Sequence, residues 1–309
     1  MKIVADHVRV TVPASAGNLG PGFDTLGMAL GVYDTIDVRL LASPEIVIEI
    51  EGEGEETLPR DGSHLFIRAL REAFDRVDAV QPGVRIMATN AIPHGQGLGS
   101  SAAAVVAAFT AARAMIEDPD ALSPEVTLAV ATKFEGHPDN AAPAIYGGAV
   151  VCWQDQLGPH AAQLDVAQQI ETAVLIPHGV VPTAEARAAL PPVVPHADAA
   201  FNASRTALLV HALSGHPELL FEATEDRLHQ GYRAPHMPSA VAMIAALRER
   251  GHAAVVSGAG PSVLVIGTDL STKGLGTGPL DWADGVGGDT WRCVHTIGKV
   301  EGASARVVK

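Results

Sequence analysis

The sequence is poor in the residues that build covalent or metal-bound frameworks. It has only two cysteines, Cys152 and Cys293, which are far apart and outside any CxxC pair. We therefore expect free thiols in a reducing compartment, with no disulfide framework or structural zinc site. Aromatic residues make up 4% of the chain, while hydrophobic residues, mostly alanine and valine, make up 47%. The core must accordingly form from small side chains that pack closely.

Clustered lysine and arginine residues are also missing, and the formal net charge is −14. A nucleic-acid-binding surface is not expected, because phosphate backbones are bound by grouped cationic side chains. An acidic chain can still bind a phosphorylated ligand where the anion-binding groups are local.

Long apolar runs are absent as well. The longest begins at Ala102 and is interrupted by Thr110 and Arg113, which makes it too short to span a bilayer. The first residues contain no apolar segment of the kind found in secretory signals. The sequence therefore predicts a cytoplasmic protein with no membrane partner.

The pattern of hydrophobic residues predicts an α+β protein. A length of 309 residues exceeds what one core usually organises, so two domains are expected. Strands dominate the first 90 residues and helices dominate residues 180–250, a segregation that is typical of α+β folds. Strands are predicted at 8–12, 33–41, 45–51, 84–89, 149–153, 172–176, 253–257, 262–266 and within 294–308, the first of them ending at Pro13. Helices are predicted at 63–75, 101–116, 124–136, 183–190, 198–214, 216–227 and 238–250, and a loop at 268–290.

The most informative segment is a glycine-rich loop that precedes the alanine-rich helix. Gly95, Gly97 and Gly99 let the backbone approach a ligand and turn its N–H groups inward. Ser100 and Ser101 follow at the helix start, where free N–H groups and the helix dipole favour an anion. The segment is neither a P-loop nor a GxGxxG dinucleotide motif. We interpret it as a nucleotide phosphate site formed by Pro93, His94, Gly95, Gln96, Gly97, Leu98, Gly99, Ser100, Ser101, Ala102 and Ala103.

This loop resembles the central motif of the GHMP kinases, a superfamily of small-molecule kinases. Two other stretches agree in order and spacing, namely residues 12–27 with the N-terminal substrate motif and residues 257–262 with the C-terminal glycine motif. Within the superfamily the chain is similar to the homoserine kinase family, on the evidence of residues 18–24, 135–144 and 226–233.

The resemblance implies a two-domain α+β fold of the GHMP kinase type. Residues 1–165 would form an N-terminal ribosomal-S5-domain-2-like α+β domain with a left-handed βαβ unit, and residues 166–309 a C-terminal α/β sandwich. The implied reaction is the phosphorylation of L-homoserine to O-phospho-L-homoserine in threonine biosynthesis, with ATP and Mg²⁺. Family habit also implies a homodimer.

L-Homoserine is a zwitterion with a terminal hydroxyl, so its pocket needs an anion for the ammonium and cations for the carboxylate. By the resemblance, Arg187 and Arg233 bind the carboxylate, and an arginine fork suits that geometry. The remaining substrate residues are predicted to be Asn18, Asp24, His137 and Asn140. Thr183, which is either a helix cap or a contact to the substrate or the nucleotide, lies one turn before Arg187.

Two acidic residues match the positions that serve phosphoryl transfer in the superfamily. Glu135 is the predicted Mg²⁺ ligand, with Ser101 or Ser100 as its partner, because this ion takes few protein oxygens. Asp139 is predicted to position the reacting groups, since transfer of a phosphoryl group depends on positioning and charge more than on deprotonation.

Three alternatives and one departure qualify this interpretation. Where homoserine kinases usually carry asparagine, this chain has His64, which could contact the nucleotide base with one ring nitrogen. The alternatives are a mevalonate or sugar kinase of the same superfamily, a non-catalytic nucleotide or metabolite sensor, and a nicotinamide-dependent oxidoreductase. A nicotinamide-dependent oxidoreductase would need an acidic ribose-binding residue after the loop, at a suitable strand end, and this chain has none there.

Overall fold

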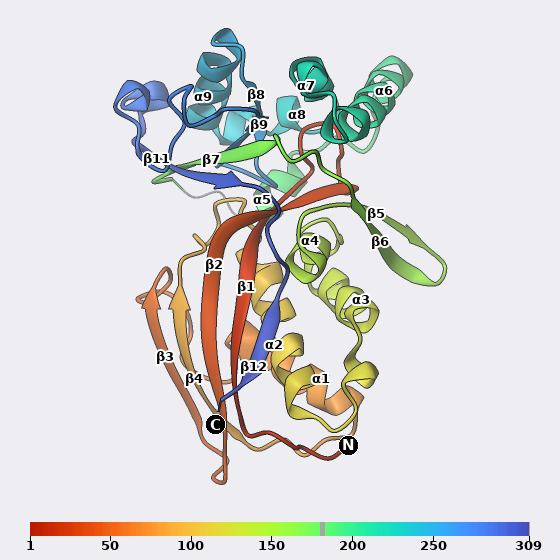
Figure 1. The fold of residues 1–309 in the computed structure, drawn as a ribbon, viewed down its shortest axis with the longest axis vertical. Helices are drawn as coiled ribbons and strands as arrows, with labels where there is room; N and C mark the ends of the chain where they lie inside the picture. Colours follow the sequence, from red (N-terminus) through yellow and green to blue (C-terminus); the bar gives the residue numbers. More distant parts are fainter. Residues whose placement is uncertain (180–182, 309) are drawn as a thin grey trace.

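The computed structural model describes residues 1–179 and 183–308, apart from the side chains of Thr183–Glu185 and Asp281, and contains two β-sheets (Figure 1). The first sheet has the order β12-β1-β2-β4-β3, with β5 paired to the start of β2 and β6 paired to β5. The second has the order β10-β11-β7-β9-β8. The first-sheet strands are β1 His7–Gly17, β2 Leu26–Leu41, β3 Ile46–Gly52, β4 Gly83–Asn90, β5 Ala149–Asp155, β6 Gly158–Leu164 and β12 Ser304–Val307. Those of the second are β7 Glu171–Pro177, β8 Ala253–Val256, β9 Val263–Gly267, β10 Gly278–Pro279 and β11 Trp291–Ile297.

Helices cover one face of the first sheet, and further helices lie above the second in this view (Figure 1). The α-helices are α1 Leu65–Arg76, α2 Ser100–Met115, α3 Pro124–Glu135, α4 Ala141–Tyr146, α5 Thr183–Ala188, α6 His196–Leu213, α7 Leu220–Ala223, α8 Gln230–Arg233 and α9 Pro238–Glu249. The short 3₁₀ helices are η1 Pro119–Leu122, η2 Pro217–Leu219, η3 Ala234–His236, η4 Asp281–Ala283 and η5 Val286–Gly288. None of the described helices is both long and apolar enough to cross a membrane.

The alternating pattern of β1 and β2 explains why helices cover only one face of the first sheet. In β1, Val8, Val10 and Val12 are fully buried, and the residues between them are partly exposed. This period of two is the signature of a strand with one buried face. Helices α1 to α4 lie over the buried side, as Figure 1 shows. The βαβ unit is present as β3, α1 and β4, whose two strands run parallel.

Helix α2 is buried over most of its surface because its residues are small. Ala102, Ala103, Val105, Val106 and Ala107 are fully buried, and Ala104 between them is partly buried. A helix that is apolar all round belongs inside a protein. The position of α2 between the first sheet and the neighbouring helices fixes the loop that begins it.

The prediction that the first strand ends at Pro13 was wrong. Strand β1 continues to Gly17, and its register with β2 shifts between Pro13 and Ala14. A bulge of this kind accommodates a proline, which cannot donate a ladder hydrogen bond. As a result, β1 delivers the residues after Gly17 directly to the junction between the two sheets.

Other differences from the predicted elements are local. Strand β6 and helix α4 were not predicted, and β2 begins at Leu26, before the predicted start at Tyr33. The predicted helix at 216–227 is replaced by η2 and α7. The loop predicted at 268–290 contains β10, η4 and η5 as short pieces.

The last strand crosses back between the two halves. The predicted boundary after residue 165 falls between β6, in the first sheet, and β7, in the second. Strand β12, however, pairs antiparallel with β1, so the end of the chain belongs to the first sheet. The predicted domain boundary after residue 165 stays a prediction, and it could apply only to the part of the chain that precedes β12.

Candidate active site

A pocket of about 120 Å³ lies where the glycine-rich loop meets the turn after β1 and the loops of the second sheet. We call it the charged pocket. Residues that are far apart in the sequence, and that were predicted to bind the same substrate, lie together in this pocket. Its lining residues are Asn18, Asp24, Gly95, Gly97, Leu98, Gly99, Ser100, Ser101, Glu135, His137, Asn140, Arg187, Arg233, Gly258 and Ala259.

The glycine-rich loop takes a conformation that only glycine adopts readily. Gly95, Gly97 and Gly99 all have positive φ, at 68°, 74° and 68°, in the left-handed region that disfavours other residues. Gly99 is the N-cap of α2, so the free N–H groups of the first helical turn face the charged pocket beside Ser100 and Ser101. A helix start of this kind, with a glycine-rich backbone before it, can bind an anion.

The C-terminal glycine motif braces this loop. The Oγ of Ser257 donates to the carbonyl oxygen of Gly97 at 2.8 Å. A Cβ atom on Gly97 would collide with the carbonyl oxygen of Ser257, so the two backbones approach as closely as glycine permits. Gly258 and Ala259 also line the pocket. From the sequence, the small residues Gly258, Gly260 and Ser262 were expected either to let the backbone approach the phosphates or brace the first motif, or to form a tight turn required by the fold.

The turn after β1 holds two polar residues in left-handed backbone conformations. Asn18 and Asp24 have φ of 71° and 53°. The Oδ1 of Asn18 accepts from the backbone N–H of Asp24 at 3.0 Å, and its Nδ2 donates to the carbonyl of Gly258 at 2.9 Å. Both ends of the Asn18 amide are therefore used within the protein. Strained backbone of this kind persists where surrounding contacts hold it, often at functional sites.

Asp24 and Arg187 form an ion pair at the mouth of the charged pocket. The two guanidinium nitrogens lie 2.8 and 3.2 Å from the two carboxylate oxygens, which is the bidentate arrangement. Both side chains are partly exposed. The pair can open to receive a ligand that carries both charges. Thr183, one turn earlier in α5, has a side chain outside the described part of the chain.

Arg233 supplies a second, buried cation. It is 2% exposed and its Nε donates to the carbonyl of Ala186 at 3.1 Å, while Nη1 lies 3.3 Å from the carbonyl of Gly258. His229, whose Nδ1 is 3.2 Å from Nη1, fixes the guanidinium from behind. Burial is the main factor that lowers the pKa of Arg233, and the charge of Arg187 lowers it further. The ordinary pKa of arginine is so high that the guanidinium stays charged at neutral pH.

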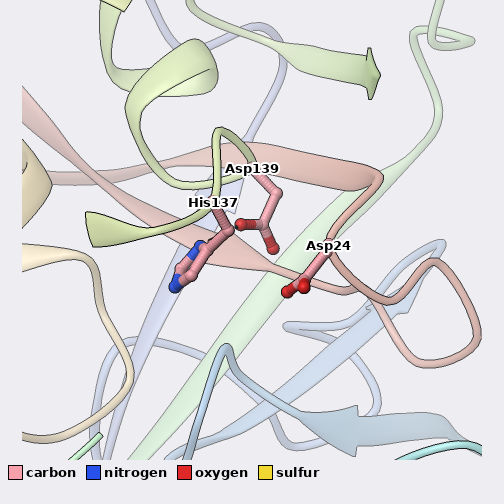
Figure 2. Close-up of side chains that lie close together, drawn as sticks. All are labelled: Asp24, His137 and Asp139. Atoms are coloured by element: carbon pink, nitrogen blue, oxygen red, sulfur yellow. Dashed lines mark hydrogen bonds and ion pairs between the residues drawn. The ribbon is translucent and has the colours of Figure 1, made fainter. Parts of the chain in front are cut away.

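Figure 2 shows three titratable side chains that converge beside the charged pocket, with His137 and Asp139 on the segment after α3 and Asp24 on the turn after β1. The Nδ1 of His137 lies 2.5 Å from Oδ1 of Asp139. The other oxygen of Asp139 accepts from the backbone N–H of Asn18 at 3.1 Å. Asp139 is fully buried and does not line the pocket. It therefore contacts the pocket through His137 and Asn18.

The pKa of His137 is raised by its surroundings. Burial acts to lower it, but the hydrogen bond and charge of Asp139, with the charge of Asp24, outweigh burial. The three side chains bring potential metal-ligand atoms within 4.8 Å of one another. Nδ1 of His137 and Oδ1 of Asp139 already contact each other, and Asp24 already pairs with Arg187. This cluster therefore differs from the predicted Mg²⁺ ligands and is better described as an ion-pair network.

Glu135 and Ser101 lie together, as the prediction for a metal site requires. The Ser101 Oγ donates to Oε1 of Glu135 at 2.5 Å, across the junction between α2 and α3. Burial raises the pKa of Glu135, and the hydrogen bond from Ser101 opposes that shift. A partly buried carboxylate that forms no ion pair among the described residues, beside the glycine-rich loop, fits a divalent cation with oxygen ligands.

The other predicted residues are placed in four ways. Asn140 lines the charged pocket, and its Oδ1 accepts from the Oγ of Ser15 at 3.1 Å. Ala102 and Ala103 are fully buried in α2 behind the loop. The amide of Gln96 donates to the carbonyl of Pro177 at 3.0 Å, which ties the loop to β7. Pro93 lines neither the charged pocket nor the pocket described next.

A second pocket of about 120 Å³ adjoins the first at Ser100 and Ser101, which line both. We call it the apolar pocket. Its walls are Val12, Ile36, Leu58, Leu65, Phe66, Ile86, Ala88 and Ala104, with Asp34, His64, Asn90 and His94 as its polar members. The sequence indicated His64 and His94 but gave no role to Asp34, because a single buried aspartate in a strand has no motif around it.

His64 caps helix α1 and faces this pocket. Its Nδ1 accepts from the backbone N–H of Phe66 at 3.2 Å, so in the neutral ring the proton is on Nε2. Burial, with a smaller effect from His94, lowers the pKa of His64. The ring is thus neutral at physiological pH and retains one N–H donor beyond the cap.

The two sheets, the glycine-rich loop at the start of α2 and the charged pocket beside it define a GHMP-type small-molecule kinase. The family model for the GHMP kinases N terminal domain matches residues 64–148, which contain that loop. Over 281 residues the chain is 49% identical to homoserine kinase from Streptomyces coelicolor (strain ATCC BAA-471 / A3(2) / M145), covering 90% of this chain and 91% of that protein. It is 48% identical to homoserine kinase from Clavibacter michiganensis subsp. michiganensis (strain NCPPB 382), covering 85% and 83%.

The solved structures agree with this fold. The crystal structure of homoserine kinase from Cytophaga hutchinsonii superposes with a TM-score of 0.81 at 23% identity, covering 99% of each chain. The chain belongs to the homoserine kinase family. The predicted α+β GHMP kinase fold is confirmed.

Proposed function

We propose that the chain transfers the terminal phosphoryl group of ATP to the side-chain hydroxyl of L-homoserine, with Mg²⁺ held by Glu135 and Ser101. The observation that carries this proposal is the charged pocket. It combines an anion-binding helix start with two carboxylates, those of Asp24 and Glu135, and the two guanidinium groups of Arg187 and Arg233. The curated relatives are named homoserine kinases and match this chain over most of their length, which supports the same activity.

The zwitterionic end of homoserine would replace the ion pair between Asp24 and Arg187. Asp24 would then bind the ammonium group, and Arg187 and Arg233 the carboxylate. A pocket that carries both charges rejects an alcohol lacking them, because its own charged groups would be left without partners. Mevalonate has no ammonium and sugars have neither charge, so both would leave this pocket unsatisfied.

The two adjoining pockets suggest how the nucleotide lies. The phosphates would occupy the cradle from Gly95 to Ser101, at the junction of the pockets, and the base would enter the apolar pocket. There, the Nε2–H of His64 is available as a donor to the base. The pocket walls are apolar side chains, which suit the faces of an aromatic ring.

The transfer itself would depend on position and charge. Asp139 orients His137 and the Asn18 backbone, and the raised pKa of His137 favours its charged form, which would place positive charge beside the transferring group. A Mg²⁺ ion at Glu135 and Ser101 would neutralise phosphate charge. Asp139 acts as a positioning residue, because its carboxylate oxygens are already engaged and it does not face the pocket. We extend the proposal to a cytoplasmic homodimer, as the family resemblance implies.

A substrate panel tests the proposal. ATP consumption would be measured with Mg²⁺ and L-homoserine, mevalonate or galactose, and with L-2-aminobutyrate as a control that keeps both charges but lacks the hydroxyl. We expect turnover to be highest on L-homoserine and absent on the control. Faster turnover on another alcohol would refute the substrate. No phosphoryl transfer to any of them would favour the sensor.

A further inference from the structure

The polar atoms of the apolar pocket have an arrangement that the phosphate and homoserine contacts do not explain. One oxygen of Asp34, Oδ1, accepts from two consecutive backbone N–H groups, that of Ala91 at 2.7 Å and that of Ile92 at 2.9 Å. These amides directly precede the glycine-rich loop. Asp34 is 7% exposed and lines the pocket, and its second oxygen has no hydrogen-bond partner among the described residues. A buried carboxylate therefore offers one free acceptor to this pocket.

His94 offers a second acceptor. Its Nε2 is buried and has no hydrogen-bond partner within the described part of the chain. The backbone carbonyl of Glu53 acts to raise the pKa of the ring, and we assign the ring proton to Nδ1, the nitrogen that remains to face that carbonyl when Nε2 is unpaired. In the neutral ring Nε2 then carries a lone pair. A buried polar atom left without a partner is costly, which is expected where a ligand completes the bond.

We propose that Asp34 and His94 select the purine base, by accepting hydrogen bonds from the amino group at C6 of adenine. An amino group donates two hydrogens, and the pocket presents two acceptors. A purine with a carbonyl at C6 would instead direct the lone pairs of its oxygen at the Asp34 carboxylate and at the lone pair on Nε2 of His94. The site would then reject that base by repulsion as well as by lost bonds. This inference rests on the proposed function, because it requires the base to occupy the apolar pocket.

The charge state of Asp34 makes the proposal testable on the unaltered chain. Burial raises the pKa of Asp34 to about 6, against the lowering effect of the Ile92 and Ala91 amides, and the charge of Glu53 raises it further. The other titratable groups lining the pocket are His64 and His94, both with a pKa lowered chiefly by burial. Above pH 6 Asp34 is a pure acceptor. Below it the protonated carboxyl can donate to a carbonyl at C6.

The experiment compares kcat/KM for ATP and ITP, which carry the same phosphates and sugar and differ at C6 and the adjoining N1. Loss of loop order would affect both nucleotides alike, so the ATP:ITP ratio isolates the reading of the base. Asp34→Asn keeps an oxygen for the two amides but presents an NH₂ group to the pocket. We expect this variant to lower the ratio by at least about tenfold. His94→Phe, which removes the acceptor and keeps a ring, should lower it less.

The controls separate this inference from the proposed function. Asp118→Asn, at a carboxylate that accepts from the Asp120 amide and lines neither pocket, should leave the ratio unchanged. In the unaltered chain the ratio should fall between about pH 7.5 and pH 5.5, as Asp34 takes up a proton. A ratio that is the same at both pH values and in both pocket variants overturns the assignment of Asp34 and His94, even if homoserine is phosphorylated normally. Absence of homoserine phosphorylation with either nucleotide would instead refute the proposed function.

Discussion

The charged pocket and the apolar pocket share Ser100 and Ser101 but differ in almost every other respect. In the charged pocket, Asp24, Arg187 and Arg233 are held by bidentate or buried contacts, so recognition depends on a few paired charges. The apolar pocket is walled by aliphatic side chains and contains a few polar atoms, two of which have a free lone pair. The comparison shows that one loop can join two kinds of recognition. It also predicts that substitutions in the two pockets will affect different ligands.

The largest effect is expected from Arg233→Ala. The variant should weaken L-homoserine binding by about 2–5 kcal/mol, because the substrate carboxylate would lose a buried partner. The affinity for ATP should stay close to that of the unaltered chain. Isothermal titration with homoserine, in the presence of a non-hydrolysable ATP analogue, measures the first affinity, and a separate titration with the analogue measures the second.

Arg227→Ala is the matched control for that prediction. Arg227 lies in the same segment, but its side chain is half exposed and pairs with Asp198 at 3.3 Å. Its loss should leave homoserine binding unchanged. Equal losses of ATP and homoserine affinity in Arg233→Ala would contradict the division between the two pockets.

Glu135→Gln is expected to have the next largest effect, on the step that joins the pockets. We expect kcat to fall by about a hundredfold, since charge neutralisation of the transferring group is weakened. Homoserine binding should change little. Steady-state rates at saturating homoserine, with Mg²⁺ varied, would show whether the variant also needs more of the ion.

The start of the same helix offers a control for Glu135. Glu125 accepts from the Oγ of Ser123 at 2.7 Å and is exposed, so it reproduces a glutamate–serine contact away from both pockets. Glu125→Gln should retain the kcat of the unaltered chain. An unchanged kcat in Glu135→Gln would remove its proposed metal role.

The smallest effect is expected from the pH dependence of stability at His137. Because its pKa is raised in the folded protein, the pair with Asp139 stabilises the fold fully below the ordinary histidine value of 6.5. That contribution is lost as the pH rises through the higher folded value. The Tm difference between the unaltered chain and His137→Gln should therefore be largest at mildly acid pH and shrink towards alkaline pH.

His160→Gln provides the comparison for this measurement. His160 pairs with Asp155 at 3.0 Å on the exposed hairpin of β5 and β6. A solvent-screened pair contributes little, so its variant should show a nearly constant Tm difference across the same range. A pH-independent difference for His137→Gln would show that the buried pair does not titrate as its geometry implies.

Much of the fold could be predicted because local signals agreed with tertiary packing. The alternation of valines in β1 and the small residues of α2 each indicated an element and its burial. Pro13 misled because a bulge accommodates it, and bulges depend on the partner strand. Helix α4 and strand β6 were missed because a six-residue helix and a seven-residue edge strand carry too short a periodic pattern to distinguish.

For the site, motif residues were predicted and their contacts were not. The loop from Gly95 to Ser101 combines local residue types with a helix start, so the sequence contains the whole signal. The hydrogen bond from the Asn18 amide to Gly258 joins segments that are far apart in the chain. The burial of Asp139 beside His137 also depends on such segments, so neither contact could be predicted from local sequence. Asp34 could not be recognised for the same reason, since it bonds to the backbone amide of Ala91, which follows the end of a different strand, β4.

Strand β12 pairs with β1 although all of the second sheet is made between them. As the polypeptide leaves the ribosome, the sheet that supports the glycine-rich loop must wait with an open edge beside β1 until the last segment emerges. The nucleotide-binding half therefore cannot finish folding by itself during synthesis. For the same reason, cutting the chain at one point between the halves would release two fragments, neither of which contains a complete first sheet.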